Sequence, residues 1–235
     1  MHLLKKILPS LCTLANLVFG LVALVMLLNE QWDWAGVYIV AGMLFDGFDG
    51  RLARFLGVSS EFGKQLDSLS DLVTFGVAPA LLAYAVSLSQ FGYLGLIIAF
   101  SFTLMGALRL ARFNVSSGKA DGYFIGLPIT LTGGFLALTM MYAAYIPGWI
   151  IAVLTLFLAW LMVCTIKYPD FKTAGVSRPV VLAIVAVLIA VVILFKWHAS
   201  AFFMFPIVIY VLVGIKNYLV DYWQYYRRRR QGGAI

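Results

Sequence analysis

The chain has 235 residues, of which 63% are hydrophobic and only 11% are charged. An average soluble domain carries about 25% charged residues, so this composition excludes an ordinary soluble protein and predicts a polytopic membrane protein. The net charge of +7 does not indicate nucleic-acid binding, because the basic residues are scattered except for the run from Arg227 to Arg230. Such a run after a hydrophobic helix is typical of a membrane anchor that contacts anionic lipid headgroups.

Eight apolar segments each come near the ~20 residues that a helix needs to cross the hydrocarbon of a bilayer. They cover residues 11–29, 34–56, 61–88, 92–114, 124–145, 148–167, 177–195 and 200–222. Before them, residues 1–9 combine large apolar side chains with two lysines, which favours a helix lying flat on the membrane surface. The sequence therefore predicts an all-α polytopic membrane protein, a bundle of about eight transmembrane helices plus a short N-terminal interfacial helix.

The distribution of charge predicts the orientation in the membrane. With the N-terminus in the cytosol, every basic residue except Lys196 falls in an inner loop or tail, whereas the first outer loop carries Glu30 and Asp33. We therefore expect a multi-pass protein of the cell inner (cytoplasmic) membrane with both termini in the cytosol.

The second and third segments are only partly apolar, and their polar halves contain Asp46, Asp49, Asp67 and Asp71. Residues three or four apart share a helix face, so an antiparallel pair of helices would direct all four carboxylates into one gap. At ~4 Å and an effective dielectric of ~20, each pair of like charges costs on the order of 4 kcal/mol. Two divalent cations would balance the four charges, and an oxygen-only ligand set favours Mg²⁺ or Mn²⁺ over zinc.

Small residues and an arginine accompany these aspartates. Gly50 and Gly63 each lie about one turn from an aspartate, and Ala53 leaves further room for a ligand to approach the backbone. Arg54 can reach phosphate oxygens with its fork of donors, so the segment predicts a nucleotide-pyrophosphate site at the cytosolic leaflet. The alternative is that small residues only allow close helix packing and that the acids form salt bridges. That alternative does not explain four acids with so few bases close by in sequence.

The spacing of these residues resembles the signature of the CDP-alcohol phosphatidyltransferases. Every fixed position is present: Asp46-x2-Asp49-Gly50-x2-Ala53-Arg54-x8-Gly63-x3-Asp67-x3-Asp71. The resemblance implies that the four aspartates hold two divalent cations and that Asp71 also takes the proton from the acceptor hydroxyl. It further implies that CDP contacts Gly50, Ala53, Arg54 and Gly63.

The opening of the first apolar segment, from Pro9 to Asn16, is also similar to that family, although Ser10 stands where the family commonly has asparagine. By this resemblance Thr13 and Asn16 contact cytidine or phosphate. The alternative is that both are polar residues satisfied inside a helix bundle.

Further stretches resemble the bacterial integral-membrane phosphatidylserine synthases of this family, namely residues 75–79, 109–114, 126–128 and 166–172. The resemblance implies transfer of a phosphatidyl group from CDP-diacylglycerol to L-serine. Arg109, Arg112 and Asn114, near the cytosolic end of the fourth segment, would then bind the acceptor. The alternative for the two arginines is that they are ordinary basic residues of an inner loop.

Two other functions stay open at this point. The same chemistry could act on glycerol 3-phosphate or an inositol phosphate, and intramembrane aspartates also occur in ion-coupled transporters. We expect a single domain in which residues 10–172 form the catalytic part and residues 173–235 add two spans and a basic tail. The expected partners are CDP-diacylglycerol, L-serine and membrane lipids, with no nucleic acid, and the resemblance implies a homodimer.

Overall fold

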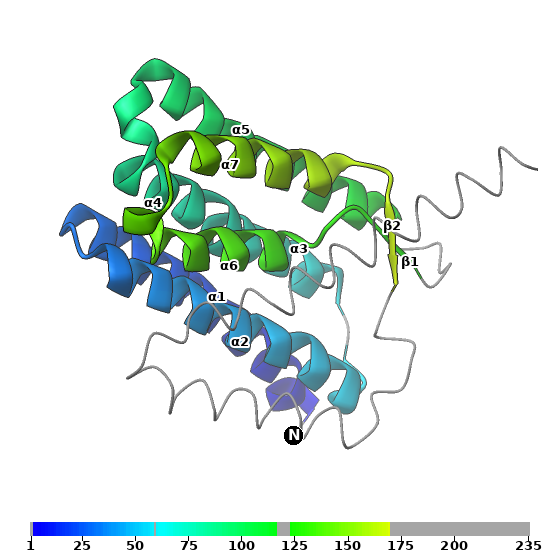
Figure 1. Ribbon diagram of the computed structural model, residues 1–235. Coiled ribbons are helices and arrows are strands. Elements are labelled where there is room, and N and C mark those ends of the chain that lie inside the picture. The colour runs from blue at the N-terminus through cyan, green and yellow to red at the C-terminus, as the bar shows by residue number, and fades with distance from the viewer. Residues whose placement is uncertain (1, 59, 117–122, 170–235) are drawn as a thin grey trace, which may run out of the picture. The chain divides into compact units, whose positions relative to one another are not determined.

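The computed structural model describes residues 2–58, 60–116 and 123–169 (Figure 1). The helical elements are α1 (His2–Leu28), α2 (Trp32–Leu56), α3 (Glu61–Asp71), η1 (Leu72–Val77), α4 (Ala78–Val86), η2 (Leu88–Phe91), α5 (Tyr93–Ser116), α6 (Ile129–Met140), η3 (Ala143–Tyr145) and α7 (Gly148–Val163). All of them belong to one compact unit. The strands β1 (Tyr123–Ile125) and β2 (Lys167–Pro169) pair antiparallel in a second unit.

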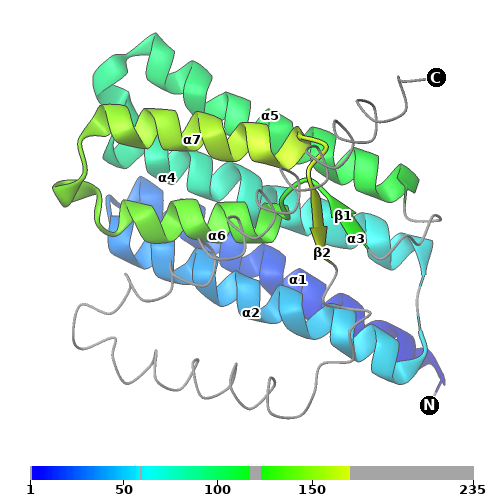
Figure 2. The ribbon, with the colours of Figure 1, turned by 45° about the vertical axis from the view of Figure 1, so that its right-hand side comes forward.

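Helices α1 and α2 form an antiparallel hairpin and run side by side along their length (Figures 1 and 2). Their connection is a tight turn in which Glu30 adopts a left-handed backbone with a φ of 58°. The backbone N–H of Gln31 donates to the carbonyl of Met26 at 2.9 Å and so closes the end of α1. The hairpin carries the polar half of α2 to the end of the unit at which α3 begins.

Helix α3 continues through η1 into α4 as one long element, but its geometry changes directly after Asp71. Ser60 caps the start, since its side chain accepts a hydrogen bond from the backbone N–H of Gly63 at 3.0 Å. Residues 72–77 form a π-helical turn, a rare geometry that is frequent at functional sites. Neighbouring helices hold this turn, because Thr74 donates to the carbonyl of Asn16 at 3.0 Å and Thr103 donates to that of Gly76 at 3.2 Å.

Large apolar side chains lie both inside the helical unit and on its surface. The core contains Ile39, Phe75, Phe102 and Leu136, all of which are fully buried. Exposed apolar side chains form a stripe along α5 that consists of Leu94, Ile97, Phe100, Leu104 and Leu108. Such a surface is unfavourable in water and is suited to the hydrocarbon of a bilayer.

Three described segments are long and apolar enough to cross a membrane: Leu8–Leu28, Glu61–Val86 and Tyr93–Val115. Two further apolar helices, Ile129–Met140 and Gly148–Val163, are shorter. Together with the apolar surface, these helices indicate a membrane-associated protein, which agrees with the class predicted from composition.

The predicted helix positions agree with six of the eight apolar segments, and the other two lie outside the described residues. Two predicted ends were wrong. The fifth segment, predicted from residue 124, begins as a strand, because Gly126 has a φ of 77° and Pro128 restricts the residue before it, so the helix starts only at Ile129. The sixth helix ends at Val163, and a strand occupies residues 167–169. Apart from the two three-residue strands, the described residues form helices and their connections, in agreement with the predicted all-α class.

The first predicted element also differs in form. Residues 2–9 do not make a separate helix, because the backbone continues from His2 to Leu28 as the single helix α1. Pro9 lies inside this helix.

Candidate functional site

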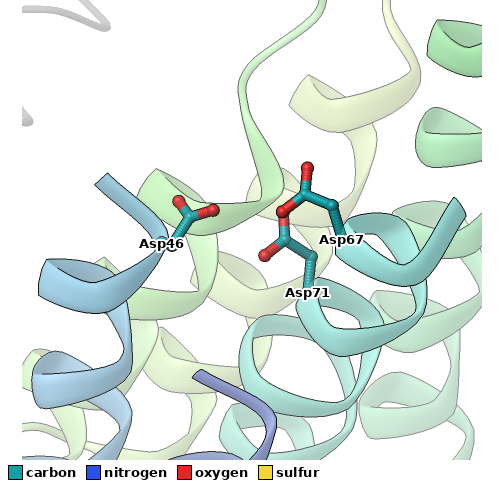
Figure 3. Close-up of side chains that lie close together, drawn as sticks. All are labelled: Asp46, Asp67 and Asp71. Atoms are coloured by element: carbon teal, nitrogen blue, oxygen red, sulfur yellow. The ribbon is translucent and has the colours of Figure 1, made fainter. Parts of the chain in front are cut away.

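Three of the four predicted aspartates lie together at the polar ends of α2 and α3. One carboxylate oxygen from each of Asp46, Asp67 and Asp71 lies within 4.8 Å of the other two. In Figure 3, Asp67 and Asp71 project from successive turns of one helix toward Asp46 on the other. Asp71 is 6% exposed, and the other two are half-buried. Asp49 lies one turn beyond Asp46 on α2, and its side chain is outside the described part.

Neutral side chains from two other helices donate hydrogen bonds to this cluster. The Nδ2 atom of Asn16, on α1, donates to Oδ1 of Asp71 at 3.1 Å. The hydroxyl of Thr130, on α6, donates to Oδ2 of Asp46 at 3.2 Å. Neutral donors orient a carboxylate without cancelling its negative charge. Four helical elements therefore contribute to one acidic centre.

The donor set suits a hard divalent cation. Three carboxylates at this separation repel one another strongly unless a cation bridges them. Asn16 is fully buried, and its Oδ1 atom has no hydrogen-bond partner among the described residues, although Nδ2 of the same amide is bonded to Asp71. A buried amide oxygen beside the carboxylates is a further oxygen atom of the kind that can ligate a metal. Oxygen donors of this kind are those that Mg²⁺ and Mn²⁺ prefer.

The residues predicted to contact CDP lie on α2 and α3, which carry the aspartates, and on α1. Gly50, Ala53 and Arg54 belong to α2, and the side chains of the last two are outside the described part. Gly63 lies in the first turn of α3, where its N–H is used by the Ser60 cap. Thr13 lies one turn before Asn16 on α1, is 4% exposed, and donates to the carbonyl of Pro9 at 3.2 Å.

The residues predicted to bind the acceptor have different surroundings. Arg109 is 8% exposed, and its guanidinium carbon lies 5.7 Å from the centre of the Phe113 ring. Arg112 donates to the carbonyls of Val163 at 2.8 Å and Met162 at 3.3 Å, which are among the last carbonyls of α7. Arg112 therefore caps that helix.

Asn114 connects the end of α5 to α3. Its Nδ2 atom donates to Oγ of Ser68 at 3.0 Å and to Oε1 of Gln65 at 3.2 Å. Ser68 follows Asp67 in the chain, so this link joins the end of α5 to the turn of α3 that carries Asp67.

Comparison with known proteins identifies the family. Residues 6–166 match the CDP-alcohol phosphatidyltransferases. The chain belongs to this family. It is 41% identical over 164 residues to the CDP-diacylglycerol–serine O-phosphatidyltransferase of Bacillus subtilis, which covers 70% of this chain and 90% of the relative. This confirms the membership predicted from the aspartate spacing.

Two further relatives are also CDP-diacylglycerol–serine O-phosphatidyltransferases by name. The Helicobacter pylori protein is 36% identical over 171 residues, covering 70% of this chain and 72% of the relative. The Methanocaldococcus jannaschii protein is 42% identical over 163 residues, covering 68% of this chain and 72% of the relative. The similarity therefore extends across bacterial and archaeal members of the family.

Sequence reasoning did not single out two side chains at the centre, Ser68 and Thr130. Ser68 lies between the aspartates of the family motif, and its partner Asn114 is 46 residues away in the chain. Thr130 is 84 residues from Asp46. The only available signal was its position two residues after the stretch 126–128, which resembles the family.

Proposed function

We propose that this protein transfers the phosphatidyl group of CDP-diacylglycerol to the hydroxyl of L-serine, which gives phosphatidylserine and CMP. The serine oxygen forms a bond to the β-phosphorus, and the bond from that phosphorus to the bridging oxygen breaks. CMP leaves with the electron pair, and the hydroxyl proton passes to Asp71. The observation that carries the proposal is the three-carboxylate centre on α2 and α3, in a chain similar to enzymes named for this reaction.

The four motif aspartates would hold two divalent cations, Mg²⁺ or Mn²⁺. When bound, the cations would neutralise the pyrophosphate and stabilise the negative charge that leaves with CMP. Asp71 would also be the general base, a role supported by its burial and by the hydrogen bond from Asn16 that orients it. Hydrogen bonds from Asn16 to Asp71 and from Thr130 to Asp46 support a rigid arrangement of the reacting groups.

The nucleotide would lie along the small residues of α2 and α3. Gly50, Ala53 and Gly63 carry little or no side chain, and Arg54 would bind phosphate oxygens with its fork of donors. Thr13 and Asn16 would approach the same ligand from α1. This arrangement brings the pyrophosphate to the carboxylates that bind cations.

Serine would bind between the acidic centre and the end of α5. Serine carries a carboxylate, and Arg109 offers a largely buried cation to bind it. Asn114 supports this location because it bonds Ser68, on the turn of α3 that carries Asp67. Arg112 would act indirectly on the serine site, because its hydrogen bond to the end of α7 holds α5 in place.

We place this site at the cytosolic leaflet of the inner membrane, in a single-domain protein with about eight spans, both termini in the cytosol and a homodimeric assembly. The charge distribution of the sequence supports the orientation. Such a site is open to a lipid substrate from the bilayer and to serine from the cytosol.

A direct assay tests the reaction and its acceptor. Purified full-length protein receives CDP-diacylglycerol and Mn²⁺ together with L-serine, glycerol 3-phosphate or an inositol phosphate, and release of CMP is measured. We expect CMP release that depends on L-serine. Release only with a phosphorylated acceptor would refute the assigned acceptor. Ion flux into liposomes without nucleotide, in the absence of CMP release, would refute the enzyme function.

A further inference from the structure

Thr130 contacts the acidic centre from outside the family motif. It lies in the first turn of α6, whose N-cap is Pro128, and its hydroxyl donates to Oδ2 of Asp46 at 3.2 Å. The first turn of a helix carries a partial positive charge, which favours a nearby carboxylate. The bond therefore joins a half-buried acid of α2 to the start of another helix.

The direction of this hydroxyl distinguishes Thr130 from the other threonines of α6. A threonine inside a helix commonly donates to the carbonyl three or four residues earlier. Thr132 does so toward Pro128 and Ile129, and Thr139 does so toward Phe135. Thr130 instead bonds a side chain on a different helix.

The packing of α2 against α6 fixes the position of Thr130. Gly36 faces Ala137 and Met141, and Met43 lies against Gly134, so the two helices run antiparallel in a close register. A Cβ atom at Gly134 would collide with the side chain of Met43. The same register continued toward the start of α6 brings Thr130 opposite Asp46. The contact thus belongs to a tightly packed pair of helices and does not depend on a loop.

We propose that Thr130 is a positioning residue for the metal ligand Asp46. Its hydroxyl holds the Asp46 carboxylate toward Asp67 and Asp71, and so prepares the three acids to bind a divalent cation together. Hydrogen bonds that orient metal ligands typically affect metal affinity by 10- to 100-fold. The inference rests on the proposed function, because it requires that the centre bind a cation.

The test measures Mn²⁺ binding by full-length protein in detergent, from the electron paramagnetic resonance signal of free Mn²⁺. Thr130→Val keeps the shape of the side chain and removes the donor. We expect its dissociation constant for Mn²⁺ to rise about tenfold, with the Mn²⁺ concentration for half-maximal CMP release rising by the same factor. Thr130→Ser, which restores a hydroxyl, is expected to bind within about threefold of the unmodified protein. Should Thr130→Val fail to fold, Thr130→Cys takes its place, because its thiol is a much weaker donor.

Thr132→Val is the matched control, because it also removes a threonine hydroxyl from α6. Among the contacts described, that hydroxyl donates only to the backbone carbonyls of Pro128 and Ile129. We expect this variant to bind Mn²⁺ as the unmodified protein does. Unchanged Mn²⁺ affinity in Thr130→Val, or an equal loss in Thr132→Val, would overturn the positioning role. An unmodified protein that binds no Mn²⁺ would instead contradict the proposed function.

Discussion

Two polar regions of the helical unit use their hydrogen bonds differently. Around the aspartates, Asn16 and Thr130 donate from neutral side chains to the carboxylates that gather between α2 and α3. At the end of α5, Arg112 donates instead to backbone carbonyls that close α7, and Asn114 joins two helices through Ser68. The first region orients acids while leaving their charge for a cation, whereas much of the second holds helix ends together. Substitutions in the two regions should therefore fail in different ways.

The largest effect should come from the acid at the centre of the first region. Asp71→Asn keeps the shape of the side chain but removes the carboxylate that is proposed to serve as both base and metal ligand. We expect CMP release to fall by about 10³-fold or more, because general-base catalysis alone typically contributes 10²- to 10⁴-fold. CMP release from purified protein measures this effect.

Asp33→Asn is the control for that substitution, because Asp33 is an exposed acid at the start of α2, away from the polar half of the helix. It should leave the rate within about twofold of the unmodified protein, as expected for a surface change. Equal rates for the Asp71→Asn variant and the control would remove Asp71 from the reaction.

A smaller effect should separate two roles of Asn16, the orientation of Asp71 and direct contact with the nucleotide. If orientation dominates, Asn16→Ala should lower kcat by about 10- to 100-fold and change the KM for CDP-diacylglycerol little. Steady-state kinetics over a range of CDP-diacylglycerol concentrations provide both constants. A raised KM with unchanged kcat would assign Asn16 to nucleotide binding alone.

The smallest effect should come from the second region. Arg112→Met removes the donors that close α7, and a hydrogen bond from a charged group is worth about 1.5–3 kcal/mol. We expect the melting temperature to fall by about 3–12 °C, with the KM for serine unchanged. Thermal unfolding of the detergent-solubilised protein and serine kinetics test both parts.

Asn114→Ala gives the complementary result within the same region. It is expected to raise the KM for serine about tenfold, because Asn114 is proposed to line the acceptor site next to Asp67. A KM for serine that rises in Arg112→Met and not in Asn114→Ala would reverse these assignments.

The sequence was most informative where residue spacing alone determines position. The spacing of Asp67 and Asp71 by four residues places both carboxylates on one face of any α-helix, and a short loop to α2 brings Asp46 opposite them. Helix ends were less predictable, because the hydropathy of residues 124–128 continues that of α6 while Gly126 and Pro128 interrupt the backbone. The π-helical turn after Asp71 has no signal in the apolar pattern.

Contacts between distant segments were the part that could not be predicted. Thr130 meets Asp46 only because α2 and α6 pack in one register, and Arg112 reaches Val163 only because α7 ends beside it. An isolated arginine near the end of an apolar helix has the same appearance whether it binds a substrate or caps a neighbouring helix. Family resemblance could indicate that such residues are functionally important, but only the three-dimensional structure showed which atoms they contact.

The central claim is that the acids of α2 and α3 together hold divalent cations. Anomalous diffraction from crystals of the full-length protein soaked in Mn²⁺ tests it most directly. We predict anomalous peaks in contact with the carboxylates of Asp46, Asp67 and Asp71, and the loss of those peaks in Asp67→Asn. Crystals that show no Mn²⁺ between these side chains, or that show it bound elsewhere, would contradict the account.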